Sequence, residues 1–93
     1  MPKFIVERPC PGAGKMTEEQ IRELAEQTCG VVRVMGPRIQ WVESFITDDK
    51  LFCIFIAPNE EAVFEHSTLG RFPVEAIFQV RRIIDPTSAT MMH

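Results

Sequence analysis

The sequence predicts an α+β domain of ferredoxin-like βαββαβ topology, in which a four-stranded antiparallel sheet carries two helices on one face. Two observations support this prediction. Segments rich in β-forming residues alternate with two segments that begin with helix-capping signals, and a two-residue turn joins the two central strands. The predicted strands are 3–8, 38–47, 50–57 and 74–84, and the predicted helices start after Thr17 and Asn59 and end at Gly36 and Gly70.

The first strand and the first helix are marked by local signals. Residues 3–8 are rich in β-formers, and Pro9 stops the strand. Thr17 and Gln20 have the spacing of a capping box, in which each residue satisfies a free backbone N–H of the other. Gly30 lies inside this helix, where glycine costs about 1 kcal/mol relative to alanine. We therefore expect Gly30 to mark a close-packing position.

The hairpin around Asp48-Asp49 assigns side chains of the two central strands to faces, because they alternate along a strand. One face is predicted to carry Trp41, Glu43 and Phe45 with Phe52, Ile54 and Ile56. The opposite face is predicted to carry Gln40, Val42, Ser44 and Ile46 with Leu51, Cys53 and Phe55. Both faces are largely apolar, and the helices cover only one. Because a bare apolar face is unusual for a monomer, we expect a homodimer, formed sheet against sheet or through a shared pocket.

The second half of the chain contains a helix, a strand and a tail. The predicted apolar stripe of the second helix is Ala62, Val63, His66 and Leu69. The last strand is predicted to include Val80, Ile83 and Ile84. Residues 87–93 are polar and methionine-rich, which predicts a frayed tail after a single domain over residues 3–86.

Composition and charge exclude several classes of protein. The 93 residues include 10 Lys and Arg against 13 Asp and Glu, and a net charge of −3 argues against nucleic acid as a partner. No apolar run approaches the ~20 residues of a membrane span, and the N-terminus lacks the pattern of a signal peptide. Three widely spaced cysteines are typical of a reducing compartment rather than of a disulfide framework. We therefore expect a cytoplasmic protein.

Two groups of residues are candidates for a functional site. Thiolate and neutral imidazole are ligands of transition metals, and Cys53 and His66 approach each other if the helices cover the face of Cys53. Cys10 is a further candidate ligand. On the other face, Trp41 and Phe45 form an apolar wall around Glu43. That carboxylate suits either an ion pair across an interface or a polar anchor in a small-molecule pocket.

Several stretches resemble a family of small bacterial proteins with a ferredoxin-like fold that includes a nickel-binding protein. The resemblance covers residues 3–86 and rests on Gly36–Ser44, the hairpin Thr47–Lys50, the strand of Cys53 ending in Ala57-Pro58, and Glu65-His66 followed by Gly70–Pro73. It implies a dimeric, cytoplasmic α+β sandwich that binds nickel. Cys53 and His66 match positions where the family often has Cys and His. The nickel-binding member is richer in histidine near the end of its first strand. This chain has Glu7-Arg8-Pro9-Cys10 there, so that a metal site would use Cys10 or Glu7.

The leading interpretation is a small homodimeric binding protein that takes up a divalent transition metal such as Ni²⁺. The alternative is a cofactor-free small-molecule-binding protein, or an enzyme of the dimeric α+β barrel type, that uses Trp41, Glu43 and Phe45. The sequence favours a binding protein over an enzyme, because no catalytic motif accompanies these residues.

Overall fold

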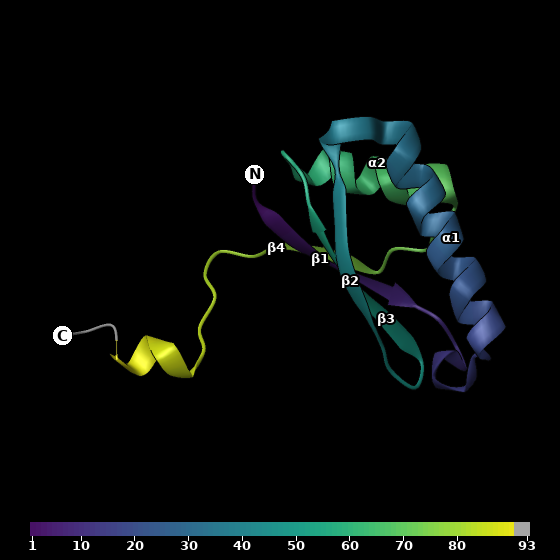
Figure 1. The fold of residues 1–93 in the computed structure, drawn as a ribbon, viewed down its shortest axis with the longest axis horizontal. Coiled ribbons are helices and arrows are strands. Elements are labelled where there is room, and N and C mark those ends of the chain that lie inside the picture. Colours follow the sequence, from purple (N-terminus) through teal and green to yellow (C-terminus); the bar gives the residue numbers. More distant parts are fainter. Residues whose placement is uncertain (91–93) are drawn as a thin grey trace.

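The computed structural model describes residues 1–90 and confirms the βαββαβ order (Figure 1). The strands are β1 Lys3–Pro9, β2 Gln40–Ile46, β3 Lys50–Ile56 and β4 Ala76–Gln79, and the helices are α1 Glu18–Met35 and α2 Glu60–Gly70. The four strands form one sheet in the order β2-β3-β1-β4, and each neighbouring pair is antiparallel. Among the described residues, no helix is long and apolar enough to cross a membrane.

The predicted capping box of α1 is confirmed. Thr17 Oγ1 accepts a hydrogen bond from the backbone N–H of Gln20 at 3.1 Å, and Gln20 Oε1 accepts one from the N–H of Thr17 at 2.9 Å. The prediction for Gly30 is wrong. A Cβ at this position would meet only the end of the Arg33 side chain, at 3.9 Å. Gly30 therefore faces open space, and its cost to the helix is not offset by close packing.

α2 begins as predicted but ends one residue later. Asn59 Oδ1 accepts from the N–H of Ala62 at 2.9 Å, and the left-handed residue at the other end is Arg71, with φ 56°, rather than Gly70. Packing explains the glycine, because a Cβ at Gly70 would lie 2.1 Å from the ring of Phe72. The buried side of α2 consists of Ala62, Val63, His66, Ser67 and Gly70. Leu69, which was predicted to share the apolar stripe of this helix, is 51% exposed.

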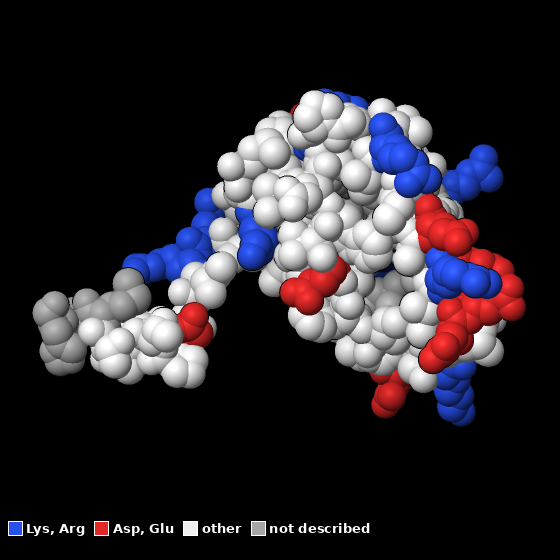
Figure 2. Space-filling model, in the orientation of Figure 1, with Lys and Arg blue, Asp and Glu red and all other residues white. Residues whose placement is uncertain are grey.

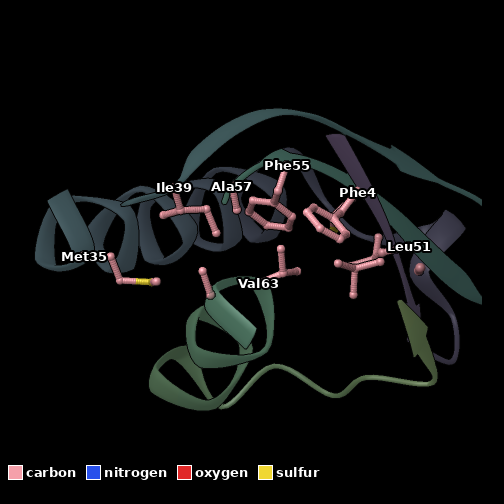
Figure 3. Close-up of a cluster of buried hydrophobic side chains, with 11 residues drawn as sticks. Phe4, Met35, Ile39, Leu51, Phe55, Ala57 and Val63 are labelled. Atoms are coloured by element: carbon pink, nitrogen blue, oxygen red, sulfur yellow. The ribbon is translucent and has the colours of Figure 1, made fainter. Parts of the chain in front are cut away.

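Both helices pack on the face of the sheet that carries Phe4 and Phe55, which we call the inner face. Figure 3 shows these two rings pointing from the strands toward Val63 of α2, with Met35 and Ile39 closing one end of the cluster. Phe4, Phe55 and Val63 are at most 2% exposed. Burial alternates strictly along β1 and β3, as a sheet covered on one side requires.

A bulge in β2 changes the predicted assignment of faces. Trp41 pairs with Phe55 and Glu43 pairs with Ile54, so that Val42 is an extra residue between them. An extra residue turns the side chains on one side of it to the other face. Trp41 therefore lies on the inner face, and the prediction that it shares a face with Glu43 is wrong.

The opposite side of the sheet, which we call the outer face, has no helix of the described chain on it. The predicted pairing after the bulge is confirmed, because Phe45 pairs with Phe52 and Glu43 with Ile54. Phe45 is 52% exposed and Phe78 is 53% exposed. The apolar side chains of the outer face are Ile5, Phe45, Phe52, Ile54, Ile56 and Phe78.

β4 is much shorter than the predicted strand over residues 74–84. The backbone N–H of Val80 still donates to the carbonyl of Lys3 at 2.8 Å, and the chain then runs past the start of β1, where none of the described residues pairs with it. Residues 81–90, which we call the C-terminal arm, extend away from the domain (Figure 1). Ile83 is 69% and Ile84 87% exposed, so the prediction that they belong to the strand is wrong. The predicted frayed tail includes residues 91–93, which lie outside the described residues.

Candidate functional site

A cavity of about 200 Å³ lies between the N-terminal half of α1 and the inner face of the sheet. Its walls are mostly apolar side chains from both layers. Ile21 of α1 and Ile46 of β2 are each 39% exposed, so the cavity is reached between these two elements. The lining residues are Arg8, Ile21, Leu24, Ala25, Thr28, Trp41, Ser44, Ile46, Leu51, Cys53, Phe55 and Phe72.

Arg8 is the one charged residue among the described residues that line the cavity. It belongs to β1, and the alternation that buries Phe4 and Val6 also buries Arg8, which is 3% exposed. Its Nη1 donates to Ser67 Oγ at 2.9 Å and to the carbonyl of Pro73 at 3.1 Å. Neither partner is charged, and the salt bridges formed within residues 1–90 do not include Arg8.

Aromatic rings stabilise the buried guanidinium in part. Arg8 Cζ lies 5.1 Å from the ring centroid of Phe72 and 6.0 Å from that of Phe55. A cation over an aromatic face within about 6 Å is attracted by the ring quadrupole. The ring of Phe72 is held in place by His66, with which it stacks at 5.5 Å.

The bulge in β2 places the only tryptophan of the chain in this cavity. Trp41 Nε1 donates to Ser44 Oγ at 2.9 Å, which satisfies the indole N–H. Because Ser44 accepts this bond, its own hydroxyl hydrogen is available to a ligand.

His66 is completely buried between Phe55 and Phe72. Its Nε2 lies 3.3 Å from the carbonyl oxygen of Thr28, which places the proton on Nε2 and leaves Nδ1 as an unpaired acceptor. Burial lowers the pKa of His66, the hydrogen bond to Thr28 opposes this change, and the charge of Arg8 adds to the decrease. His66 is therefore held in its neutral form.

The structure places two of the predicted metal ligands on the inner side of the sheet. Cys53 lines the cavity, and His66 packs against Phe55, two residues further along β3. Cys10 lies beyond the end of β1, whereas Cys53 pairs with Val6. At roughly 3.3 Å per residue, the four positions from Val6 to Cys10 separate these cysteines widely. Glu7 points to the outer face, where the hydrogen bond from Lys50 lowers the pKa of its carboxyl.

The predicted ligand-binding residues are divided between the two faces. Trp41 lines the cavity, while Glu43 and Phe45 lie on the exposed outer face. The ion pairs formed within residues 1–90 do not include Glu43.

Comparison with known proteins places this fold in a family. The family model described as nickel responsive protein SCO4226-like matches residues 4–80. The chain belongs to the SCO4226-like family. This result confirms the resemblance found in the sequence. The crystal structure of SCO4226 from Streptomyces coelicolor A3(2) superimposes with a TM-score of 0.74 and 14% identity, covering 88% of this chain and 99% of that chain. Such low identity shows a shared fold alone. No curated protein sequence matches this chain.

The family's description raises the question whether residues of this chain fit a nickel ion. Within residues 1–90, no three His, Cys, Asp or Glu side chains are close enough together to hold a metal. The unpaired Nδ1 of His66 is a suitable donor, but the ring lies between two phenylalanines and beside the Arg8 guanidinium. A nearby positive charge opposes binding of a divalent cation. The described residues of a single copy of this chain therefore do not form a nickel site.

Sequence reasoning missed Arg8 and Phe72 as members of the site. Arg8 was detectable, because it shares the two-residue period of Phe4 and Val6 and so lies on their face. Phe72 follows α2 in an irregular segment, where no periodicity predicts the direction of a side chain.

Proposed function

We propose that this SCO4226-like protein is a homodimeric small-molecule-binding protein whose ligand occupies the cavity between α1 and the sheet. The observation that carries the proposal is an accessible apolar cavity with a buried cation in its wall. Binding sites for small molecules are mostly apolar concavities with a few polar groups that orient the ligand. An apolar cavity of ~150 Å³ is large enough to take benzene, so about 200 Å³ has room for one ring with a short substituent.

Trp41 provides a direct test, because it is the only tryptophan and the chain has no tyrosine. Titration with benzyl alcohol, a neutral one-ring compound, should shift the Trp41 indole signal in a ¹H–¹⁵N NMR spectrum in a saturable way. Ala25→Leu fills the cavity from α1 and should abolish this response. Val34→Leu is the matched control, because Val34 lies on the same helix and is 78% exposed. An unchanged Trp41 signal in the wild type contradicts the proposal.

The outer face supports the dimer. Monomeric soluble proteins rarely expose a contiguous apolar surface of this kind. Figure 2 shows charged side chains crowded along α1 and others on the C-terminal arm, with a mostly uncharged area between them that an acidic group interrupts. The same chain also extends an arm with two exposed isoleucines, Ile83 and Ile84. In a two-fold dimer each protomer offers the same patch to the other, so a second copy covers both surfaces at once.

Light scattering during size-exclusion chromatography tests the dimer. We expect the wild type to be a dimer at micromolar concentration and Phe45→Asp to be a monomer, because it places a charge on the outer face. Phe64→Asp is the control, since Phe64 is 55% exposed but lies on α2. A monomeric wild type contradicts this part of the proposal.

The three cysteines are free thiols, which supports a reducing compartment such as the cytoplasm.

Nickel binding is the second candidate function, and the description of the family supports it. Since one described chain does not supply three ligands, a site that uses Cys53, His66 or Cys10 needs donors from a second protomer. Calorimetric titration with Ni²⁺ should then give half an ion per chain for one site on the two-fold axis or one ion per chain for two symmetry-related sites, and His66→Ala should weaken binding. No heat of binding in the wild type removes this candidate.

A further inference from the structure

The guanidinium of Arg8 has an unusual set of partners for a buried charge. The side chain is 97% buried, yet its two hydrogen bonds, to Ser67 and to the Pro73 carbonyl, both come from Nη1 and both go to neutral groups. Buried charges in proteins are normally paired with an opposite charge or bound to a ligand. The neighbouring acid along β1, Glu7, lies on the outer face and pairs with Lys50.

The part of the guanidinium that remains free is the part that binds carboxylates. Nε and Nη2 have no partner within residues 1–90, and neither is among the fully buried polar atoms of that range. Together they form the side edge of the guanidinium, whose two parallel N–H groups match the two oxygens of a carboxylate. Arg8 lines the cavity and these two nitrogens are not fully buried, which supports the inference that this edge is in reach of a molecule bound there.

The other residues that line the cavity determine which chemical groups the remainder of a ligand can carry. Trp41, Phe55, Phe72 and Leu24 offer apolar contacts, and the hydroxyl of Ser44 is a further donor. No acidic side chain of the described residues lines the cavity, so an anion meets no repulsion inside it.

We propose that the cavity binds a small organic carboxylate with an apolar or aromatic body, and that the side edge of Arg8 holds its carboxylate group. This inference rests on the proposed function and names the chemical class of its ligand. The competing explanation is that Arg8 is structural, stabilised by Ser67, Pro73 and the two phenylalanine rings alone. The two explanations differ in whether the charge of the ligand affects its affinity.

Three compounds of nearly equal shape test this difference in the wild type. Phenylacetate, phenylacetamide and 2-phenylethylamine are titrated at pH 7 while the Trp41 indole and the Arg8 Nε–H signals are followed by NMR. Charge-assisted hydrogen bonds predict that phenylacetate binds on the order of tenfold or more tightly than phenylacetamide, with the amine weakest. They also predict a shift of the Arg8 Nε–H signal with phenylacetate. This comparison needs no variant and stands even if substitution of Arg8 prevents folding.

Variants then assign the preference to Arg8. Arg8→Gln should remove the preference for phenylacetate over phenylacetamide, and Arg8→Lys should retain part of it because the charge remains. Arg33→Gln, an exposed position in α1, should leave it unchanged. Equal affinity of the wild type for acid and amide, or binding of benzyl alcohol without binding of phenylacetate, overturns the carboxylate inference and leaves the cavity as a binding site. Failure of all these compounds to bind overturns the proposed function itself.

Discussion

Arg8 Nη1 donates a hydrogen bond to Ser67 Oγ at 2.9 Å and so joins β1 to α2 across 59 positions of the sequence. Ser67 is 2% exposed, and its hydroxyl also donates to the carbonyl of Val63 at 3.3 Å. The bond satisfies part of a buried charge and fixes α2 above the inner face of the sheet. The position of the guanidinium at the cavity depends on it.

Ser67→Ala should destabilise the protein by about 1–3 kcal/mol, because a buried charged donor loses one of its two partners. The measurement is the free energy of unfolding in urea. Thr68→Ala is a matched control, since Thr68 makes the same type of bond to the carbonyl four residues earlier but is exposed. Equal small losses in the two variants would show that the Arg8 bond contributes nothing.

His66 should make the protein less stable as the pH falls from about 7.5 to 5.5. Its pKa is lowered in the folded state, so below the unfolded value of 6.5 the unfolded chain binds the proton and the folded chain does not. The unfolded state is then favoured, by at most ~1.4 kcal/mol per pH unit, until the pH reaches the folded pKa. The folded-state pKa values of Glu7 and Glu65 are lowered from 4.5, so the stability these carboxyls add is lost only at more acidic pH.

The check is the free energy of unfolding against pH for the wild type and His66→Gln. The variant should lose less stability over this range. Parallel curves for the two proteins would contradict a neutral, buried His66.

Gly30→Ala should stabilise the protein by about 1 kcal/mol, because alanine is the better helix former and the added Cβ meets nothing closer than 3.9 Å. Urea unfolding measures the gain. A destabilised variant would indicate that something outside the described chain packs against this side of α1.

Gly70→Ala should have the opposite effect and cost about 1–3 kcal/mol. Its Cβ would lie 2.1 Å from the ring of Phe72, which stacks on His66 and lies beside Arg8, so the ring must move. The same unfolding measurement serves, and the Trp41 fluorescence reports whether the cavity changes. Stability equal to the wild type would mean that Phe72 adjusts without cost.

Ile83→Ser with Ile84→Ser should weaken the dimer if the C-terminal arm packs on a second copy. Both side chains are more than two-thirds exposed on one chain, so the substitutions should leave the stability of the protomer nearly unchanged. Light scattering over a dilution series gives the dissociation constant. An unchanged constant would remove the arm from the interface and leave the outer face as its basis.

The order of elements, both N-terminal caps and the hairpin were predictable because each depends on residues close in the sequence. Thr17 and Gln20 contact each other within one helical turn, and the turn at Asp48-Asp49 joins strands that pair with each other. The family resemblance was likewise carried by short stretches. Each of these signals needs only the neighbours of a residue to be known.

The sequence by itself therefore determined the fold class and the alternation of side chains between the two faces of β3. Only the tertiary structure decided where Trp41 points, where β4 ends and which side chains form the cavity. A bulge at Val42 or the end of a strand depends on partners far along the chain, since one extra residue reverses a face and a strand stops where its partner stops. The cavity between α1 and the sheet arises in the same way, from the packing of segments whose side chains have no local relation to one another.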